Sequence, residues 1–464
     1  MKKTRLIRIM GIIIALSLTV LPITAFATQP PEGAEITDIY NTWAAFDIYM
    51  ASTVYGFGNE GTYSNFRGGL TTEKLAPVYK SMADALKSSA QLDLLPGELV
   101  TRGQIVAALY GLLSDEAAAA DEAAEYFAAE GLLRGRAPGD YQLDAVCTVQ
   151  EMIVLSVRVY EYAVRLAGED SKGFFWEIQG VSNTVYLLGS IHLGDNAIYP
   201  FSDKIMSAFD RSANLVVEVD VAAFSEEDMA YIQAIQLVDY ENGETIADYL
   251  SEDTFELYSI LIEALELPQE FYYLKPWAAT LGLTTLFMSA GDVEDSAAIG
   301  VDMLLLTKAY GMGKNILELE STKDQLDMFD SFSRELQEQQ LMAVLLSVLG
   351  EPGESAEADE PDSAELQAAM ELLLAGIKAG DDDVFGAIMA ESRAIDAGDP
   401  LAVEYDTAMW TQRNAVMAEG IAGFLNSETD DGDYFVVVGA GHMFGADSVI
   451  VLLTDMGYDV VRVK

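Results

Sequence analysis

The chain has 464 residues, about half of them apolar, and its 75 Asp and Glu against 26 Lys and Arg give a formal net charge of −49. This length allows two or three domains with large cores, and the apolar half excludes a disordered acidic tail. The charge excludes binding to nucleic acid or to anionic lipid, and it favours cationic or divalent-metal partners.

The first residues have the composition of an export signal. A basic stretch that ends at Arg8 precedes an apolar run from Ile9 to Pro22, and Ala25-Phe26-Ala27 supplies small residues for cleavage. This pattern predicts a signal peptide at residues 1–27 and an exported protein, extracellular or associated with the cell envelope. An uncleaved membrane anchor is the alternative. Cys147 is the single cysteine, which excludes an intramolecular disulfide.

Residues 28–170 have a mainly helical pattern. Residues 96–113 combine a turn, an N-cap at Thr101 and an amphipathic helix, and residues 122–133 give a second helix. Thr148 then caps a third helix at residues 149–166. The pattern predicts a small helical domain that ends before a Gly-containing link at residues 168–173.

Part of this region resembles an S-layer-homology module. The features are Val100-Thr101-Arg102 at one helix start, the turn Gly131-Leu132-Leu133-Arg134-Gly135, and Thr148 with Glu151 at the next start. The resemblance covers about one and a half repeats and implies a cell-wall polymer as partner. A helical domain that simply packs on the following one is the alternative.

Residues 174–464 alternate between strand and helix patterns. Apolar runs predict strands at 184–188, 215–219, 315–319, 435–438 and 459–463, and amphipathic stretches predict helices at 202–212, 252–265, 276–289 and 448–456. Short links between the two kinds of element indicate an α/β fold, with helices layered on a sheet. The charged Pro/Gly/Ser run at 351–363 predicts a disordered surface insertion in this domain.

The two histidines of the chain, His192 and His442, occupy equivalent positions. Each follows an apolar run that predicts a buried strand, and each has a glycine three residues before it, Gly189 and Gly439. Glycine lets the backbone turn sharply out of a strand and lets a ligand approach closely. Because sites in α/β sheets collect at the carboxyl ends of strands, we expect the two imidazoles to meet there.

Carboxylates also follow the predicted strands. Glu218 lies in the apolar run at 215–219, and Glu320 follows the run at 315–319. Two imidazoles with Glu218 would form a two-His, one-carboxylate site that suits Zn²⁺, Mn²⁺ or Co²⁺ acting on a bound water. Glu320 is a further candidate catalytic carboxylate. Asp220 would point the same way as Glu218 if the strand is regular.

Arg413 is the cation that we expect at this site, where its guanidinium could hold a substrate carbonyl or a developing oxyanion. Simpler roles remain open for each of these residues. The histidines could be structural groups bonded to the backbone, and Glu218 could form an ordinary salt bridge with Arg413.

These residues belong to a pattern that resembles the TraB/GumN family, which is related to the Tiki metalloproteases. The shared motifs are GSIH at 189–192, VEVD at 217–220, Gly300-Val301-Asp302, Leu319-Glu320 with Gln325, Arg413-Asn414, and VVGAGHMFG at 437–445. The resemblance spans residue 174 to the end of the chain. It implies a mixed sheet with helices on both faces.

The resemblance also implies a metal-dependent peptidase. His192, His442 and Glu218 would bind the metal, and Arg413 would be a further active-site residue. We therefore expect an exported metal-dependent hydrolase, a peptidase, that acts on peptide or protein substrates. One alternative is a non-catalytic protein of the cell envelope that binds a peptide or signal molecule. Another is a wall-associated adhesion protein that works through residues 28–170.

Overall fold

The structure is a computed structural model that describes residues 40–57, 65–114, 118–135, 137, 139–192, 196–289, 300–349, 363–394, 398–429 and 432–464. The predicted signal peptide at residues 1–27 lies outside these ranges, as do residues 351–362 of the predicted insertion. Within them, no helix has both the length and the apolar composition that crossing a membrane requires.

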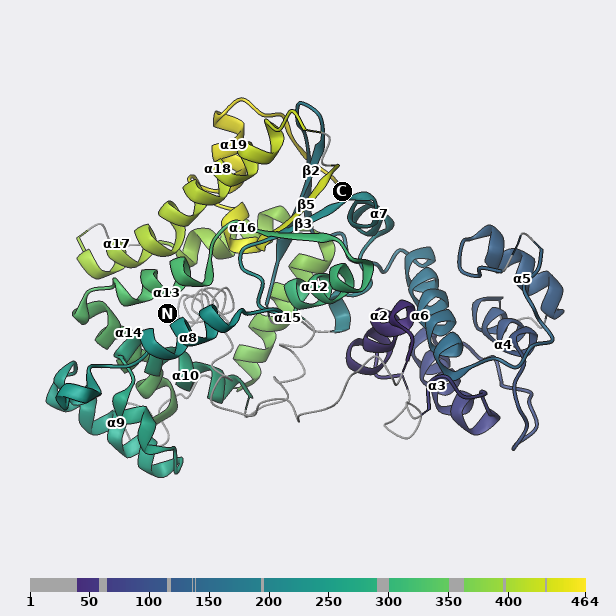
Figure 1. Ribbon diagram of the computed structural model, residues 1–464, viewed down its shortest axis with the longest axis horizontal. Coiled ribbons are helices and arrows are strands. Elements are labelled where there is room, and N and C mark those ends of the chain that lie inside the picture. The colour runs from purple at the N-terminus through teal and green to yellow at the C-terminus, as the bar shows by residue number, and fades with distance from the viewer. Residues whose placement is uncertain are drawn as a thin grey trace.

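The N-terminal region is helical, as predicted, and forms a lobe beside the larger domain (Figure 1). Its elements are η3 (Thr42–Ala44), α2 (Ala45–Tyr49), the π-helix η4 (Met50–Val54), α3 (Thr72–Leu86), α4 (Arg102–Ser114), α5 (Ala120–Ala129) and α6 (Val149–Leu166). Thr148 caps α6 in a capping box with Glu151, and Thr101 and Gln104 exchange the same pair of bonds at the start of α4. Both predicted N-caps are therefore confirmed.

The larger domain is built on one mixed sheet. In the described part of the chain its strands are β1 (Phe174–Gln179), β2 (Thr184–Ser190), β3 (Asn214–Val217), β4 (Asn315–Glu318), β5 (Tyr434–Gly439) and β6 (Val460–Arg462), in the order β4-β3-β5-β2-β1-β6. Neighbouring strands from β4 to β2 are parallel, whereas β1 is antiparallel to both β2 and β6. The α/β prediction with a mixed sheet is confirmed.

Helices surround this sheet (Figure 1). They are α7 (Asp203–Arg211), α8 (Glu226–Ile235), α9 (Glu252–Ala264), α10 (Pro276–Ser289), α12 (Val301–Met312), α13 (Thr322–Asp330), α14 (Arg334–Leu349), α15 (Ser363–Ala379), α16 (Asp382–Ser392), α17 (Pro400–Asp406), α18 (Arg413–Leu425) and α19 (Val449–Asp455). Short 3-10 turns join them: η5 (Asn196–Ile198), η6 (Tyr240–Asn242), η7 (Ile246–Asp248), η8 (Gln269–Tyr273) and η10 (Ala440–Met443). The π-helix η9 (Thr407–Gln412) leads into α18.

The central strands are apolar because both of their faces are covered. Every residue of β3 and of β5 is buried, as expected for parallel strands between helical layers. Helix α12 contacts β3, and α18 contacts β2. Because β2, β3, β4 and β5 run parallel, their carboxyl ends lie side by side at one end of the sheet. The residues that follow these strands are therefore brought together.

Candidate functional site

A buried arginine joins the ends of β3 and β4. Arg413 begins α18, and its Nη2 donates to Glu218 Oε2 at 2.7 Å and to Glu320 Oε2 at 2.7 Å. Its Nε also donates to Glu320, at 2.9 and 3.1 Å. The three residues are only 5, 3 and 8% exposed, respectively. The salt bridge between Glu218 and Arg413 that the sequence left open is therefore present, with Glu320 as a second partner.

The charges in this cluster act strongly on one another because they are removed from water. Burial raises the pKa of Glu218, and the attraction of Arg413 opposes the rise without cancelling it. The two carboxylates hold the pKa of Arg413 above its usual value although burial acts the other way. Glu218 Oε1 also accepts the main-chain N–H of Gly439, at 2.6 Å. Among the described residues Arg413 Nη1 has no hydrogen-bond partner.

His442 is completely buried in η10, next to this cluster. Its Nδ1 lies 2.6 Å from Asn414 Oδ1, while Asn414 Nδ2 donates to the main-chain oxygen of Asp447 at 3.0 Å. The second contact orients the Asn414 amide, so the proton of the imidazole lies on Nδ1 and Nε2 carries a lone pair. Nε2 is 4.0 Å from Glu218 Oε1 and has no hydrogen-bond partner among the described residues.

His192 follows β2 and is oriented by a carboxylate. Its Nδ1 lies 2.9 Å from Asp302 Oδ2, and Ser190 Oγ donates to Asp302 Oδ1 at 2.9 Å. Asp302 lies in the first turn of α12, which is fixed to the end of β2 by the bond from Val301 N to Ile191 O. Gly300 is required there, because a Cβ would overlap the main-chain carbonyl of His192.

The two imidazoles have opposite electrostatic environments. Burial lowers the pKa of His442 far below its usual value, and the charges of Arg413 and Arg393 add to this effect. Burial also lowers the pKa of His192, but attraction to Asp302 outweighs it and the pKa ends above its usual value. His442 is thus neutral over the physiological range, whereas His192 is a cation over a wider range of pH than a free imidazole.

A second network of charged residues, centred on Arg393, holds the Trp410 ring that packs on His442. Trp410 of η9 packs its ring on His442, with centroids 5.1 Å apart, and Arg393 lies 5.3 Å over the Trp410 ring. Arg393 also donates to both oxygens of Asp406 and of Asp447. Gly441 leaves the space that the Trp410 ring fills, since a Cβ there would come within 2.7 Å of it. π-Helical turns such as η9 are frequent at functional sites.

Four of the candidates that the sequence selected contact one another, namely Glu218, Glu320, Arg413 and His442. The fifth, His192, pairs with Asp302 just after β2. Ser190 at the end of β2 pairs with Gly439 at the end of β5, so the two histidine motifs follow neighbouring strand ends. Asp302 and Asn414 received no role from the sequence, although both lie in motifs that it singled out. Their aspartate-to-histidine and amide-to-histidine pairings depend on tertiary contacts.

The expected alignment of Asp220 with Glu218 is wrong. β3 ends at Val217 and the chain bends at once, so the alternation of a regular strand does not reach Asp220. Asp220 instead accepts from the Tyr310 hydroxyl, outside the cluster. Within the described ranges, moreover, no three His, Cys, Asp or Glu side chains lie close enough together to hold a metal ion in this conformation.

The domain has a mixed sheet with buried acids, an arginine and two imidazoles near the ends of its parallel strands, which is where enzymes and ligand-binding proteins of the α/β class place their sites. The family model described as the TraB/PrgY/gumN family matches residues 174–462, and the chain belongs to that family. It is also similar to an uncharacterized protein of Treponema pallidum (strain Nichols), with 25% identity over 289 residues, 60% of this chain and 79% of the relative. No solved structure matches the chain.

Proposed function

We propose that the chain is an exported metal-dependent hydrolase, a peptidase that uses His192, His442 and Glu218 to bind a divalent ion, Mn²⁺, Co²⁺ or Zn²⁺. The observation that supports this most is the buried Nε2 of His442, a lone pair with no donor among the described residues. A buried acceptor without a partner is costly, and a metal ion would satisfy it. The resemblance to the Tiki metalloproteases points to the same ligands.

The residues around the imidazoles fit this role. Metal-binding histidines usually give their other ring nitrogen to a carboxylate or carbonyl group, which fixes the tautomer and the ring orientation. Asp302 and Asn414 stand in this relation to Nδ1 of His192 and of His442. Both Nε2 atoms would then be the ligand atoms, with the Glu218 oxygen 4.0 Å from one of them.

When bound, the ion would supply an activated water and polarise a substrate carbonyl. The chain would contribute the other roles. Glu218, whose pKa is raised by burial, can accept a proton. Nη1 of Arg413, which has no hydrogen-bond partner among the residues that the structure describes, can donate to an oxyanion. Glu320 fixes the guanidinium through the bonds to Nε and Nη2.

The alternative is a non-catalytic binding protein that uses the same residues for a peptide or signal molecule. Two observations favour it: Arg413 neutralises Glu218, and no three potential ligands are grouped at metal-binding distance within the described ranges. In that case Arg413 Nη1 and His442 Nε2 would receive the polar groups of a ligand directly.

Cleavage of a peptide library by the mature chain would separate the two proposals. We expect cleavage after the chain has been stripped with a chelator and reconstituted with Mn²⁺, Co²⁺ or Zn²⁺, and none in the stripped sample. Cleavage that survives chelation, or no cleavage with any of the three ions, would contradict the hydrolase. Peptide binding that survives chelation without turnover would support the binding protein.

The proposal places the protein outside the cytoplasm, on the basis of the composition of residues 1–27. For the N-terminal region we propose contact with a cell-wall polymer, which rests on its S-layer-homology resemblance. The start of α4 and the start of α6 are joined by the ion pair of Arg102 with Glu151, at 2.5 Å, so two of the resembling segments lie side by side. Pull-down of purified wall material by the mature chain would test this contact.

A further inference from the structure

Strand β4 is an open edge of the sheet, and it ends at the proposed site. In the part of the chain that the structure describes, it pairs with β3 alone and is the first strand in the sheet order. Asn315 N and Leu319 N donate to Ala213 O and Val217 O on the β3 side. Because main-chain groups alternate in direction along a strand, the N–H and C=O groups of Ile316 and Glu318 point away from the sheet. No hydrogen bond within the described ranges uses these outward groups.

The opposite edge of the sheet is tied to its surroundings. Arg462 of β6 donates to the Asp382 carboxylate of α16 and to the main-chain oxygens of Gly173 and Gly380. In β4, by contrast, three of the four residues are exposed. Proteins normally cover or blunt such edges, because unpaired main-chain groups readily bind another strand. An open edge strand beside a proposed peptidase site is therefore a candidate for binding another polypeptide strand.

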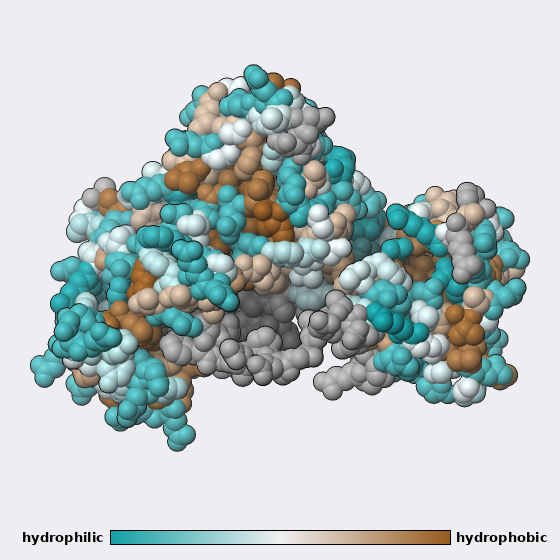
Figure 2. Space-filling model, viewed as in Figure 1, coloured by the Kyte–Doolittle hydropathy of each residue, from teal (hydrophilic) through white to brown (hydrophobic). Residues whose placement is uncertain are grey.

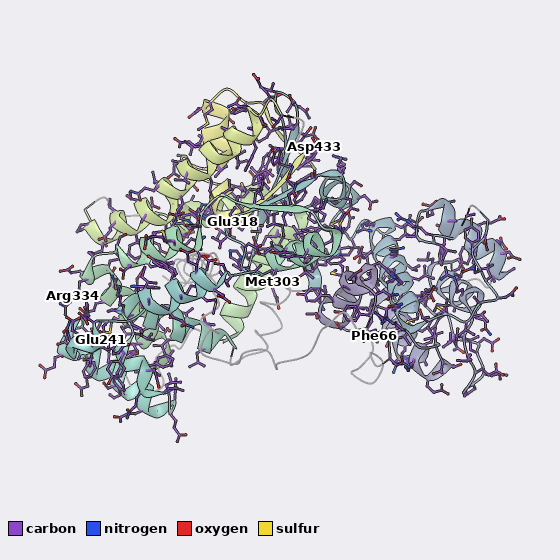
Figure 3. All side chains as sticks on the ribbon, in the orientation of Figure 1. Phe66, Glu241, Met303, Glu318, Arg334 and Asp433 are labelled. Atoms are coloured by element: carbon purple, nitrogen blue, oxygen red, sulfur yellow. The ribbon has the colours of Figure 1, made fainter. Side chains whose placement is uncertain are left out.

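The surroundings of β4 combine apolar and acidic groups. Leu317 is 36% exposed on the strand, and Val416 of α18 is 50% exposed. Gly420, one turn after Val416, packs on Leu319, which places that part of α18 next to the end of β4. In Figure 2 hydrophobic residues gather in the middle of the larger domain, near the position that Figure 3 labels as Glu318.

The acidic groups lie at the end of the strand. Glu318 Oε1 accepts from the main-chain N–H of Asp220 at 2.6 Å. Burial raises the pKa of Glu318, and the charges of Asp220 and Asp228 act in the same direction. Two residues later Glu320 contacts Arg413, whose Nη1 has no partner within the described ranges. The open edge strand therefore ends at an acidic residue, Glu318, and the chain continues from there to Glu320 in the cluster around Arg413.

We propose that β4 binds an extended basic polypeptide as an added strand, and that this strand is how the substrate reaches the site. The occupant follows from three features: outward main-chain groups that match another strand, carboxylates that match basic side chains, and continuity of the strand with Glu320. An added strand would lie about 4.8 Å from β4. The inference rests on the proposed function, since it names the substrate class of that site.

Binding can be tested without turnover, so that failure of this inference is distinguished from failure of the hydrolase. The probe is a short fluorescein-labelled peptide of alternating Lys and Thr, and its affinity for the full chain, stripped of metal, is measured by fluorescence anisotropy. We expect Ile316→Pro, which removes one outward N–H, to weaken binding about tenfold. Val460→Pro removes an outward N–H from the opposite edge, in β6, and should leave the affinity unchanged. Proline is tolerated at outward-facing edge positions.

Two modified probes test the strand geometry on the unaltered protein. They carry N-methyl groups either on the Lys amides or on the Thr amides, and only one set of amides can face β4 at a time. One probe should therefore lose affinity while the other keeps it. Glu318→Gln should reduce the preference for the Lys peptide over a matching Glu peptide by about two- to fivefold.

Three results would overturn the inference. They are an unchanged affinity in Ile316→Pro, equal effects of the two methylated probes, and a wild-type dimer that Ile316→Pro converts to a monomer. The last would assign the edge to a second copy of the chain. Loss of cleavage with intact peptide binding would contradict the hydrolase alone.

Discussion

Arg413→Met is expected to lower the free energy of unfolding by about 3 to 5 kcal/mol at neutral pH. The substitution removes the cation that Glu218 and Glu320 share and leaves two carboxylates buried within a few ångströms of each other. An uncompensated buried charge costs far more than the ion pair contributed, because the pair had already lost its hydration. Urea unfolding at several pH values measures the loss.

The loss of stability in Arg413→Met should depend on pH. In the variant, burial without a cation raises the folded-state pKa of the two carboxylates above the unfolded value of about 4.3. A carboxylate with a raised folded-state pKa contributes stability below the unfolded pKa and loses it as the pH rises through the folded pKa. The difference from wild type should therefore be greatest at neutral pH and shrink as the pH falls toward about 4.

Two variants serve as controls for this effect. Arg134→Met removes an exposed arginine of the N-terminal region and should change stability by less than about 1 kcal/mol. The double variant Arg413→Met, Glu320→Gln should recover part of the loss, because it leaves one buried carboxylate instead of two. A loss below about 1 kcal/mol in Arg413→Met, or one that is the same at every pH, would show that the cluster is not charged as described.

His192→Gln and His442→Gln are each expected to lower kcat of the reconstituted hydrolase by about a thousandfold or more. Glutamine preserves most of the side-chain volume but cannot present a neutral imidazole nitrogen. His442 is buried and His192 is partly covered, so the fold should survive a change to glutamine better than a change to alanine. Single-turnover cleavage of a peptide found in the library screen measures the loss.

The stripped protein is the matched control for the two histidine variants. Without an ion, wild type and variants should have the same residual activity, because the imidazoles act through the metal in this account. If either variant retained more than about a tenth of the wild-type activity, that histidine would be structural or would act as an acid or base on its own.

The sheet was largely predictable from the sequence because its parallel strands are buried on both faces. The apolar runs of β2, β3 and β5 reflect that burial. β1 was not predicted, since Glu177 interrupts its apolar run and its pairing with β2 depends on a tertiary contact. The helix predicted at 448–456 is present as α19, which ends at Asp455 and is followed by Met456 as C-cap and by Gly457 with a φ of 96°.

The site was predictable in its members but not in its connections. Gly-x-x-His at two strand ends selected His192 and His442, and apolar flanks selected Glu218. Periodicity could not show that Arg413 bridges Glu218 and Glu320, or that Asp302 faces His192, because these partners lie 93 or more residues apart. The contact of Asn414 with His442 likewise depends on how α18 packs beside η10.

The central claim is that two distant Gly-x-x-His motifs form one metal site, and metal content tests it most directly. Elemental mass spectrometry would be applied to the mature chain and to the His192→Gln and His442→Gln variants, each reconstituted with Mn²⁺, Co²⁺ or Zn²⁺. The account predicts about one ion per wild-type chain and a loss of the ion in both variants. No bound ion in any wild-type sample, or full occupancy in either variant, would contradict it.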